Sequence, residues 1–195
     1  MKTFITFEGI DGSGKSTIAQ QVHLRLKHLK KKVILTVEPT NTPIGEFVNE
    51  CIKKNTDPYI TTFAFISDRI LHCKQITTWL KEKNIVLCDR YAESTYAYQG
   101  AQLAATLDNP IHWLQSLSNN RILTPDRTFL FDLDPDIALK RIQNRDELIP
   151  FEKVSFLKTV RSNYLALAKE PRFRILDATN SIDTLVEKCV KDILE

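Results

Sequence analysis

Short apolar runs alternate with longer segments of helical periodicity along the whole chain. The runs are rich in β-branched residues, as strands usually are. In the longer segments apolar residues recur at helical spacing, as Ile18, Val22 and Leu26 do. The pattern predicts strands at Thr3–Glu8, Val33–Val37, Ile85–Cys88, Arg127–Asp132 and Arg174–Asp177. It predicts helices at Lys15–Leu29, Ile44–Lys54 and Thr61–Lys83, and further helices that begin near Ile137, Val154 and Ile182.

Strands that alternate with helices favour a doubly wound α/β fold, in which helices cover both faces of a parallel sheet. A chain of 195 residues fits one such domain. It contains no repeat, no low-complexity segment and no linker rich in Pro, Gly and Ser. We therefore expect a single domain over residues 1–195.

The composition is that of an ordinary globular protein and gives limited information about its partners and compartment. The hydrophobic fraction of 43% suits a globular core, and a net charge of +3 is too small to indicate nucleic acid or a membrane as partner. No stretch approaches the roughly 18 apolar residues of a transmembrane helix, and the N-terminus lacks the pattern of a signal peptide. The cysteines form no C-x-x-C pair, and the histidines are equally scattered. Buried free thiols and a cytoplasmic location are the expectation.

Glycine is concentrated at one place. The chain has only five glycines, and three of them lie between residues 9 and 14. This segment fits the phosphate-binding pattern G-x-x-x-x-G-K-[ST], with a predicted strand before it and a predicted helix after it. In such a loop backbone N–H groups surround phosphate oxygens, Lys15 reaches the β- and γ-phosphates and the Ser16 hydroxyl ligates Mg²⁺. The predicted ATP-binding residues are Gly9, Ile10, Asp11, Gly12, Ser13, Gly14, Lys15, Ser16 and Thr17.

Two charged residues follow the third predicted strand. Asp89 at a strand end beside the phosphate loop is suited to hold Mg²⁺, directly or through water. Arg90 is a fork-shaped donor suited to a second phosphate. The alternative is a simple ion pair between the two. A GTPase switch is disfavoured because neither D-x-x-G after a strand nor N-K-x-D occurs.

With these motifs in place, the sequence resembles the thymidylate kinase (dTMP kinase) family. The phosphate loop FEGIDGSGKST (residues 7–17) matches, and so does the segment DRYAESTYAYQG (residues 89–100), which is the most specific part. The helix FAFISDR (residues 63–69) and the segment LDPDIALKRI (residues 133–142), which leads into the lid, match as well. The resemblance runs in order from the start of the chain to the last strand.

The resemblance implies roles for single residues. Phe65 would stack on thymine, Arg69 would donate to a thymine carbonyl, and Tyr98 would crowd the ribose 2′ position. Asp11 would meet the sugar 3′-hydroxyl or a metal-bound water nearby, and Arg90 would clamp the acceptor phosphate. The substrate-binding set is Glu8, Asp11, Phe65, Arg69, Arg90, Ser94, Thr95, Tyr98 and Gln99. The plainer alternatives are a core role for Phe65 and a helix-surface pairing of Arg69 with Asp68.

The chain departs from the family pattern at two places. Relatives commonly have T-R-E-P-G-G-T where this chain has TVEPTNT (residues 36–42), so Val37 replaces an arginine. Gly12 stands where one branch of the family has an arginine. This resembles the bacterial-type branch, in which basic lid residues take over. Arg145 is the first candidate for that catalytic role, Arg141 the second and Arg161 a third; a solvated basic helix end is the alternative.

The resemblance implies a five-stranded P-loop kinase with a short lid, working as a homodimer. It would transfer a phosphoryl group from ATP to dTMP with Mg²⁺, in dTTP synthesis. Lys15, Arg90 and a lid arginine would be catalytic, and Ser16 and Asp89 would hold the metal. Two alternatives stay open at this point: another P-loop kinase of nucleotides or deoxynucleosides, and a non-catalytic nucleotide-binding switch.

Overall fold

A computed structural model describes residues 3–142 and 154–195 of the chain. Five parallel strands form one sheet in the order β2-β3-β1-β4-β5. This confirms the expected five-stranded parallel sheet. The strand bounds are β1 Phe4–Glu8, β2 Val33–Val37, β3 Ile85–Asp89, β4 Arg127–Asp132 and β5 Phe173–Asp177.

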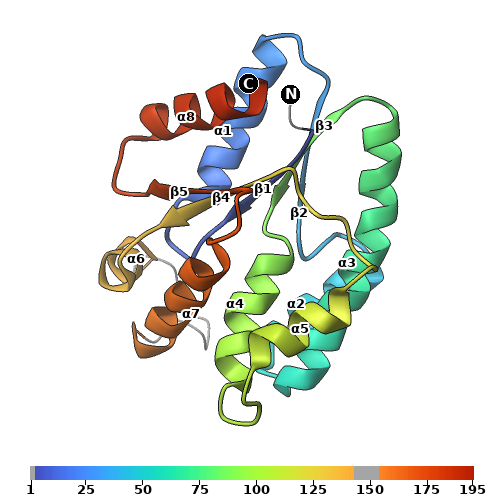
Figure 1. Cartoon of the computed structure of the whole chain (residues 1–195), viewed down its shortest axis with the longest axis vertical. Coiled ribbons are helices and arrows are strands. Elements are labelled where there is room, and N and C mark those ends of the chain that lie inside the picture. Colours follow the sequence, from blue (N-terminus) through green and yellow to red (C-terminus); the bar gives the residue numbers. More distant parts are fainter. Residues whose placement is uncertain (1–2, 143–153) are drawn as a thin grey trace.

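Helices cover both faces of the sheet, as a parallel sheet requires. Figure 1 shows α1 and α8 on one side of the sheet, and α3, α4 and α7 on the other. The N- and C-terminal ends lie near each other in this view. The bounds are α1 Lys15–His28, α2 Pro43–Lys53, α3 Pro58–Lys81, α4 Ala92–Leu103, α5 Pro110–Ser118, α6 Pro135–Ile142, α7 Val154–Leu167 and α8 Ile182–Leu194.

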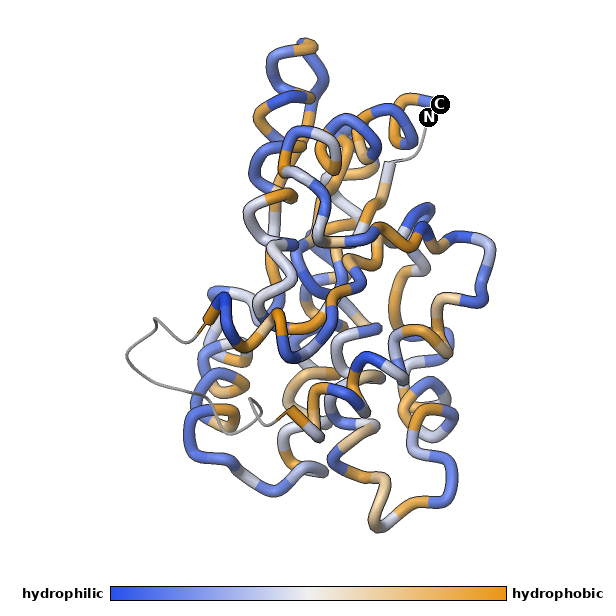
Figure 2. Tube along the Cα trace, turned by 90° about the vertical axis from the view of Figure 1, so that its left-hand side faces the viewer, coloured by the Kyte–Doolittle hydropathy of each residue, from blue (hydrophilic) through white to orange (hydrophobic). Residues whose placement is uncertain are grey.

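The central strand β1 is buried along its whole length. Its Phe7 ring lies 5.7 Å from the ring of Phe129 and 6.1 Å from that of Phe131, both on the neighbouring strand β4. Helix α1 packs on the sheet through Ile18, Val22 and Leu26, the residues whose spacing predicted it. In Figure 2 hydrophobic and hydrophilic residues alternate along the outer helices, as expected for one buried face.

Two helices, α4 and α5, were not expected from the pattern. Helix α4 is buried on every side from residue 92 to residue 100, so its sequence carries no polar face to reveal a helical period. Helix α3 begins at Pro58 rather than at Thr61, because the Asp57 side chain caps the backbone N–H groups of Tyr59 and Ile60. Helix ends of this kind depend on local capping rather than on periodicity.

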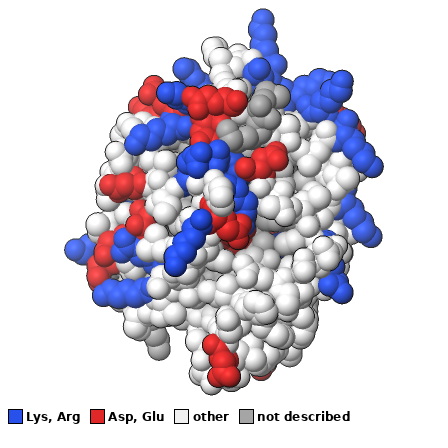
Figure 3. Space-filling model, in the orientation of Figure 1, with Lys and Arg blue, Asp and Glu red and all other residues white. Residues whose placement is uncertain are grey.

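Charged side chains of both signs lie next to one another over the upper part of the face in Figure 3, whereas the lower part of that face shows few charges. Among the residues that the structure describes, none of the helices combines the length and the apolar character that crossing a bilayer requires.

The loop between β2 and α2 is held by a very close backbone contact at Gly45. A Cβ atom on Gly45 would lie 1.9 Å from the carbonyl oxygen of Thr40, which is backbone and has no rotamer to change. We expect Gly45→Ala to destabilise the protein by about 1–3 kcal/mol. Gly100→Ala, in the middle of α4, should change the stability by no more than about 1 kcal/mol, because its Cβ would meet only side-chain atoms, of which Ile111 Cγ1 at 3.3 Å is the nearest.

Urea unfolding of the two variants and the unmodified protein measures both effects. Equal stability of Gly45→Ala and the unmodified protein would show that this loop is not fixed as described.

Candidate active site

The phosphate loop leads from the end of β1 into the first turn of α1. Gly9, Gly12 and Gly14 all have positive φ, and a Cβ at Gly9 would lie 2.7 Å from the Phe131 carbonyl oxygen. Lys15, the first residue of α1, is buried, with its Nζ 3.6 Å from Asp11 Oδ1. Burial and the nearby Arg90 lower the pKa of Lys15 to about 8. The loop, α1 and α6 enclose a hollow of about 210 Å³ in which the N-terminal N–H groups of α1 favour an anion.

Arg90 and Asp11 connect the phosphate loop to the turn after β3. The Arg90 guanidinium pairs with Asp11 Oδ1 and donates to Ser94 Oγ at 3.2 Å. It also lies 5.4 Å from the centre of the Tyr98 ring, and the Tyr98 hydroxyl donates to Asp11 Oδ2 at 3.0 Å. Burial would raise the pKa of Asp11, but Arg90 and Lys15 hold it below its usual value. Arg90 itself has a φ of 66°, a conformation that non-glycine residues adopt only where neighbours enforce it.

Asp89 does not form the ion pair with Arg90 that was the alternative reading. In the described part of the chain, Arg90 pairs with Asp11, and Asp89 Oδ1 is buried without a hydrogen-bond partner. The Ser16 side chain is exposed at the start of α1. A buried carboxylate oxygen with no donor is costly unless a ligand satisfies it.

Glu8 is fully buried at the end of β1. Its carboxylate accepts hydrogen bonds from the Tyr91 backbone N–H at 2.7 Å, Ser94 Oγ at 2.6 Å and the Tyr164 hydroxyl at 3.0 Å. Burial, helped by the charge of Glu93, raises the pKa of Glu8 to about 7. Glu8 thus holds the turn that carries Arg90 and touches Ser94, while Arg90 reaches the same serine from the other side.

A second cavity, of about 160 Å³, lies beside this cluster. Arg69 crosses its wall, with a side chain that is 0% exposed. Its Nε donates to Glu38 Oε2 at 2.8 Å, and its Nη2 donates to the Tyr91 carbonyl and to Thr95 Oγ1, at 3.0 Å each. Nη2 also lies 2.7 Å from Glu38 Oε2 as part of the ion pair. Nη1 has no partner within the described residues. The cavity is lined by Asp11, Glu38, Pro39, Ile52, Phe65, Arg69, Arg90, Tyr91, Ser94, Tyr98 and Gln99.

The surface pairing of Arg69 with Asp68 was wrong, because both side chains are buried and have other partners. Asp68 accepts from the Thr40 backbone N–H at 2.8 Å and from the hydroxyls of Thr40 and Thr42. It therefore anchors the loop that replaces the family's R-E-P-G-G segment. Phe65 is half-buried and lines the cavity rather than the core. Thr95 reaches the Arg69 guanidinium and is not among the lining residues.

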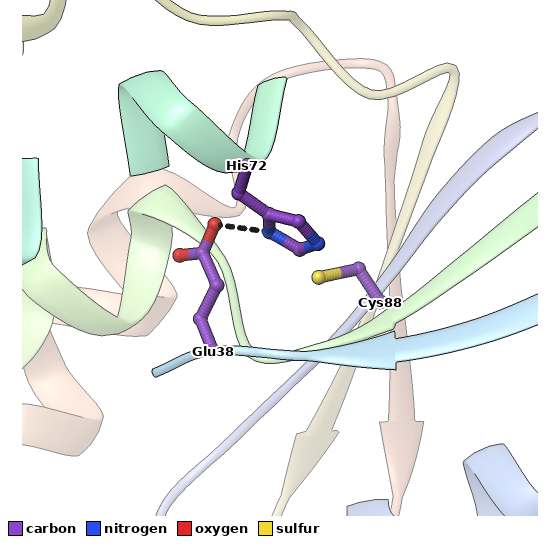
Figure 4. A group of neighbouring side chains, drawn as sticks. All are labelled: Glu38, His72 and Cys88. Carbon is purple, nitrogen blue, oxygen red and sulfur yellow. Dashed lines mark hydrogen bonds and ion pairs between the residues drawn. The ribbon is translucent and has the colours of Figure 1, made fainter. Parts of the chain in front are cut away.

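Glu38 and His72 are contacts of the site that the sequence pattern missed. His72 Nδ1 lies 2.9 Å from Glu38 Oε1, and Cys88 Sγ is nearby (Figure 4). The sequence signal was weak: a glutamate just after β2, and a histidine three residues after Arg69 on the same face of α3. Scattered histidines gave no reason to connect His72 with Glu38.

Comparison with known proteins agrees with this geometry. The family model for thymidylate kinase matches residues 7–189. A probable thymidylate kinase of Methanosarcina barkeri is 41% identical over 98% of this chain and 95% of its own length. One from Sulfurisphaera tokodaii is 41% identical over 99% and 96%, and one from Pyrobaculum aerophilum is 38% identical over 90% and 88%. The chain belongs to the thymidylate kinase family.

Two of the three candidate lid arginines lie within the described residues. Arg141, in the last turn of α6, donates to the Ala178 carbonyl at 3.2 Å and to the Gly12 carbonyl at 3.4 Å. Arg161 on α7 makes two hydrogen bonds to Asp132, at 2.6 and 2.8 Å, and approaches Asp134. Arg145 lies outside the described residues. The two described arginines are thus held by other groups of the protein.

The raised pKa of Glu8 predicts a pH dependence of stability. Between about pH 4.5 and pH 7 the folded protein holds a proton on Glu8 that the unfolded chain has released. The contribution of Glu8 to the free energy of unfolding is therefore fully present below pH 4.5 and is lost as the pH rises through 7. We expect the unfolding free energy to fall more from pH 5 to pH 7.5 in the unmodified protein than in Glu8→Gln. Urea titrations at both pH values test this, and equal falls would contradict the assignment.

Proposed function

We propose that the protein transfers the γ-phosphoryl group of ATP to dTMP, giving ADP and dTDP for dTTP synthesis. Family membership supports the reaction class. The phosphate loop and the second cavity lie on either side of Arg90 and Asp11, which line both hollows. This is the arrangement that a transfer between two bound phosphates needs.

The ATP phosphates would be bound by residues Gly9 to Thr17, with Lys15 as the main cation. Its lowered pKa is raised again when phosphate charge arrives beside it, so a bound nucleotide keeps Lys15 protonated. The acceptor is already a phosphate anion, so no general base is required. Catalysis then rests on alignment and on neutralisation of the charge that spreads over the transferred group.

Magnesium is the cofactor that these residues suit. The unpartnered, buried Asp89 Oδ1 and the exposed Ser16 hydroxyl supply the oxygen ligands that Mg²⁺ prefers, with Asp89 acting directly or through water. When bound, the metal would neutralise negative charge between the β- and γ-phosphates.

Arg90 would hold the acceptor phosphate, because its guanidinium is fixed by Asp11 and Ser94 at the border of the two hollows. Tyr98 supports the preference for deoxyribose. Its ring is buried and its hydroxyl is tied to Asp11, so the ring cannot move aside for a 2′-hydroxyl.

One observation about the second cavity supports thymine as the base. Two buried polar atoms from residues that line the second cavity have no partner in the described chain: the donor Nη1 of Arg69 and the acceptor Oε1 of Gln99. The Gln99 amide nitrogen donates to Gln102, which orients its oxygen. Thymine presents a carbonyl beside an N–H on one edge, whereas cytosine presents an amine beside a bare nitrogen. The donor–acceptor pair of the protein complements thymine and leaves both atoms unpaired against cytosine.

Stacking and transition-state charge complete the assignment. Phe65 would stack on the base, as its place in the cavity wall supports. Gly12 and Val37 supply no cation, and Arg161 is paired with Asp132. Arg145 is the proposed lid arginine, and Arg141, which lines the phosphate hollow and donates to the Gly12 carbonyl, is the second candidate.

We also propose a homodimer in the cytoplasm. Large apolar side chains on α2 and the first turns of α3 are about half exposed, Phe47 at 47%, Ile60 at 49% and Phe63 at 51%. Faces of this kind favour association. Four free, buried cysteines suit a reducing compartment.

The central test is turnover of a panel of monophosphates with MgATP, followed by ADP release and identification of the product. We expect dTMP to be the best substrate, dCMP and UMP to be poor, and thymidine to be inactive. Lys15→Ala should abolish turnover, because it removes the cation that binds the β- and γ-phosphates. Lys27→Ala, exposed on the same helix, is the matched control and should keep full activity. Equal turnover of dTMP and dCMP would refute the assignment of dTMP as the substrate.

The lid assignment is tested by single substitutions. Arg145→Ala should lower kcat by roughly 10³-fold or more with small changes in either KM, because the interaction forms chiefly in the transition state. Arg145→Lys should recover only part of the rate. Arg161→Ala, at the third candidate, should keep most of kcat, because the Arg161 guanidinium is paired with Asp132. Retention of kcat in Arg145→Ala, with its loss in Arg141→Ala, would move the role to Arg141.

A further inference from the structure

His72 is buried between two polar groups that come from the end of β2. Its Nε2 lies 2.8 Å from Thr36 Oγ1 and its Nδ1 lies 2.9 Å from Glu38 Oε1. All of the His72 side chain is shielded from solvent. Figure 4 shows Glu38 and His72 facing each other, with the Cys88 thiol close to the ring. A buried imidazole with a partner on each nitrogen has one orientation.

The same three residues do not make a metal centre. One potential ligand atom from each of Glu38, His72 and Cys88 lies within 4.8 Å of the others. Each of these atoms is already engaged, however: the imidazole nitrogens by Glu38 and Thr36, and the Cys88 thiol by the Arg90 carbonyl at 3.0 Å. A metal ion held by all three would break the hydrogen bond of the thiol and one of the two hydrogen bonds of the imidazole.

The Glu38 carboxylate connects His72 to Arg69. One carboxylate oxygen faces His72, and the other accepts a hydrogen bond from Arg69 Nε at 2.8 Å and lies 2.7 Å from Nη2. Since both oxygens are engaged, the carboxylate plane is fixed, and the guanidinium is fixed with it. Its free Nη1 is the atom assigned above to the base carbonyl.

We propose that His72 is a positioning residue for base selection, acting through Glu38 to hold the Arg69 guanidinium against the base. The proposal rests on the function proposed above, in which Arg69 reads a carbonyl of the base. The His72 Nδ1–H donates to Glu38, and the Thr36 hydroxyl donates to Nε2. Without the imidazole, Glu38 Oε1 is a buried acceptor with no donor. The carboxylate then turns to share the remaining N–H groups of Arg69 and draws the guanidinium away from the base.

Kinetics of three variants test the proposal. His72→Leu removes the donor, and we expect kcat/KM for dTMP to fall about tenfold, the size of one charge-assisted hydrogen bond. The fall should appear mainly in KM for dTMP, with KM for ATP and the rate with dCMP unchanged. His72→Asn places an amide N–H where Nδ1 stood and should restore most of the dTMP preference. Ile76→Ala, buried one turn further along α3, is the matched control: it lowers stability but keeps the preference.

The outcomes separate the two proposals. If the unmodified protein shows no preference for dTMP, the proposed function fails. If it prefers dTMP and His72→Leu keeps that preference, the positioning role fails while the function stands. Equal loss of preference in His72→Leu and Ile76→Ala would reduce His72 to a packing residue and would also overturn the proposal.

A second measurement needs no activity. Nitrogen-15 NMR of the His72 ring in the unliganded protein should place a proton on Nδ1, because that nitrogen faces a carboxylate. A neutral ring with its proton on Nε2 alone would leave Glu38 without a donor and would overturn the proposal.

Discussion

The central position of β1 is the constraint on which the site depends. Because β1 pairs in parallel with both β3 and β4, the ends of all three strands meet at one edge of the sheet. Glu8 ends β1, and Arg90 follows the end of β3. The buried Glu8 carboxylate then joins the two strand ends by accepting the Tyr91 N–H, and Arg90 is thereby set in its left-handed conformation. Ladder hydrogen bonds that stabilise the core thus also aim the charged groups.

At this edge of the sheet two arginines are neutralised by carboxylates of the protein itself. Arg69 and Glu38 form a fully buried pair, and Arg90 and Asp11 form a part-buried pair between the two hollows. Breaking such a pair strands the remaining charge in a medium of low dielectric constant, which costs more than the pair itself contributes. The pairs also leave single donors and acceptors unpartnered at the cavity, so substrate recognition uses what the internal pairing leaves over.

Periodicity and motif spacing predicted the strands, the phosphate loop and the segment after β3, because each depends on neighbours in the sequence. Helix α4 was not predicted, because it is buried on every side and shows no solvent-exposed polar face. The hydrogen-bond and ion-pair partners of the charged residues were not predicted, for a different reason. Arg90 meets Asp11 across 79 residues and His72 meets Glu38 across 34, and no local pattern specifies which of many oppositely charged groups the fold brings together. The alternative of a surface pair between Arg69 and Asp68 was wrong for this reason.

The contact between Gly12 and α6 has a consequence for how the family can diverge. A Cβ at residue 12 would lie 2.5 Å from the backbone carbonyl of Ala138, and the φ of 83° already disfavours any side chain there. An arginine at this position therefore cannot be gained while α6 stays where it is. Any side chain at residue 12 would thus need a coordinated shift of the loop and of α6, which a single substitution does not supply.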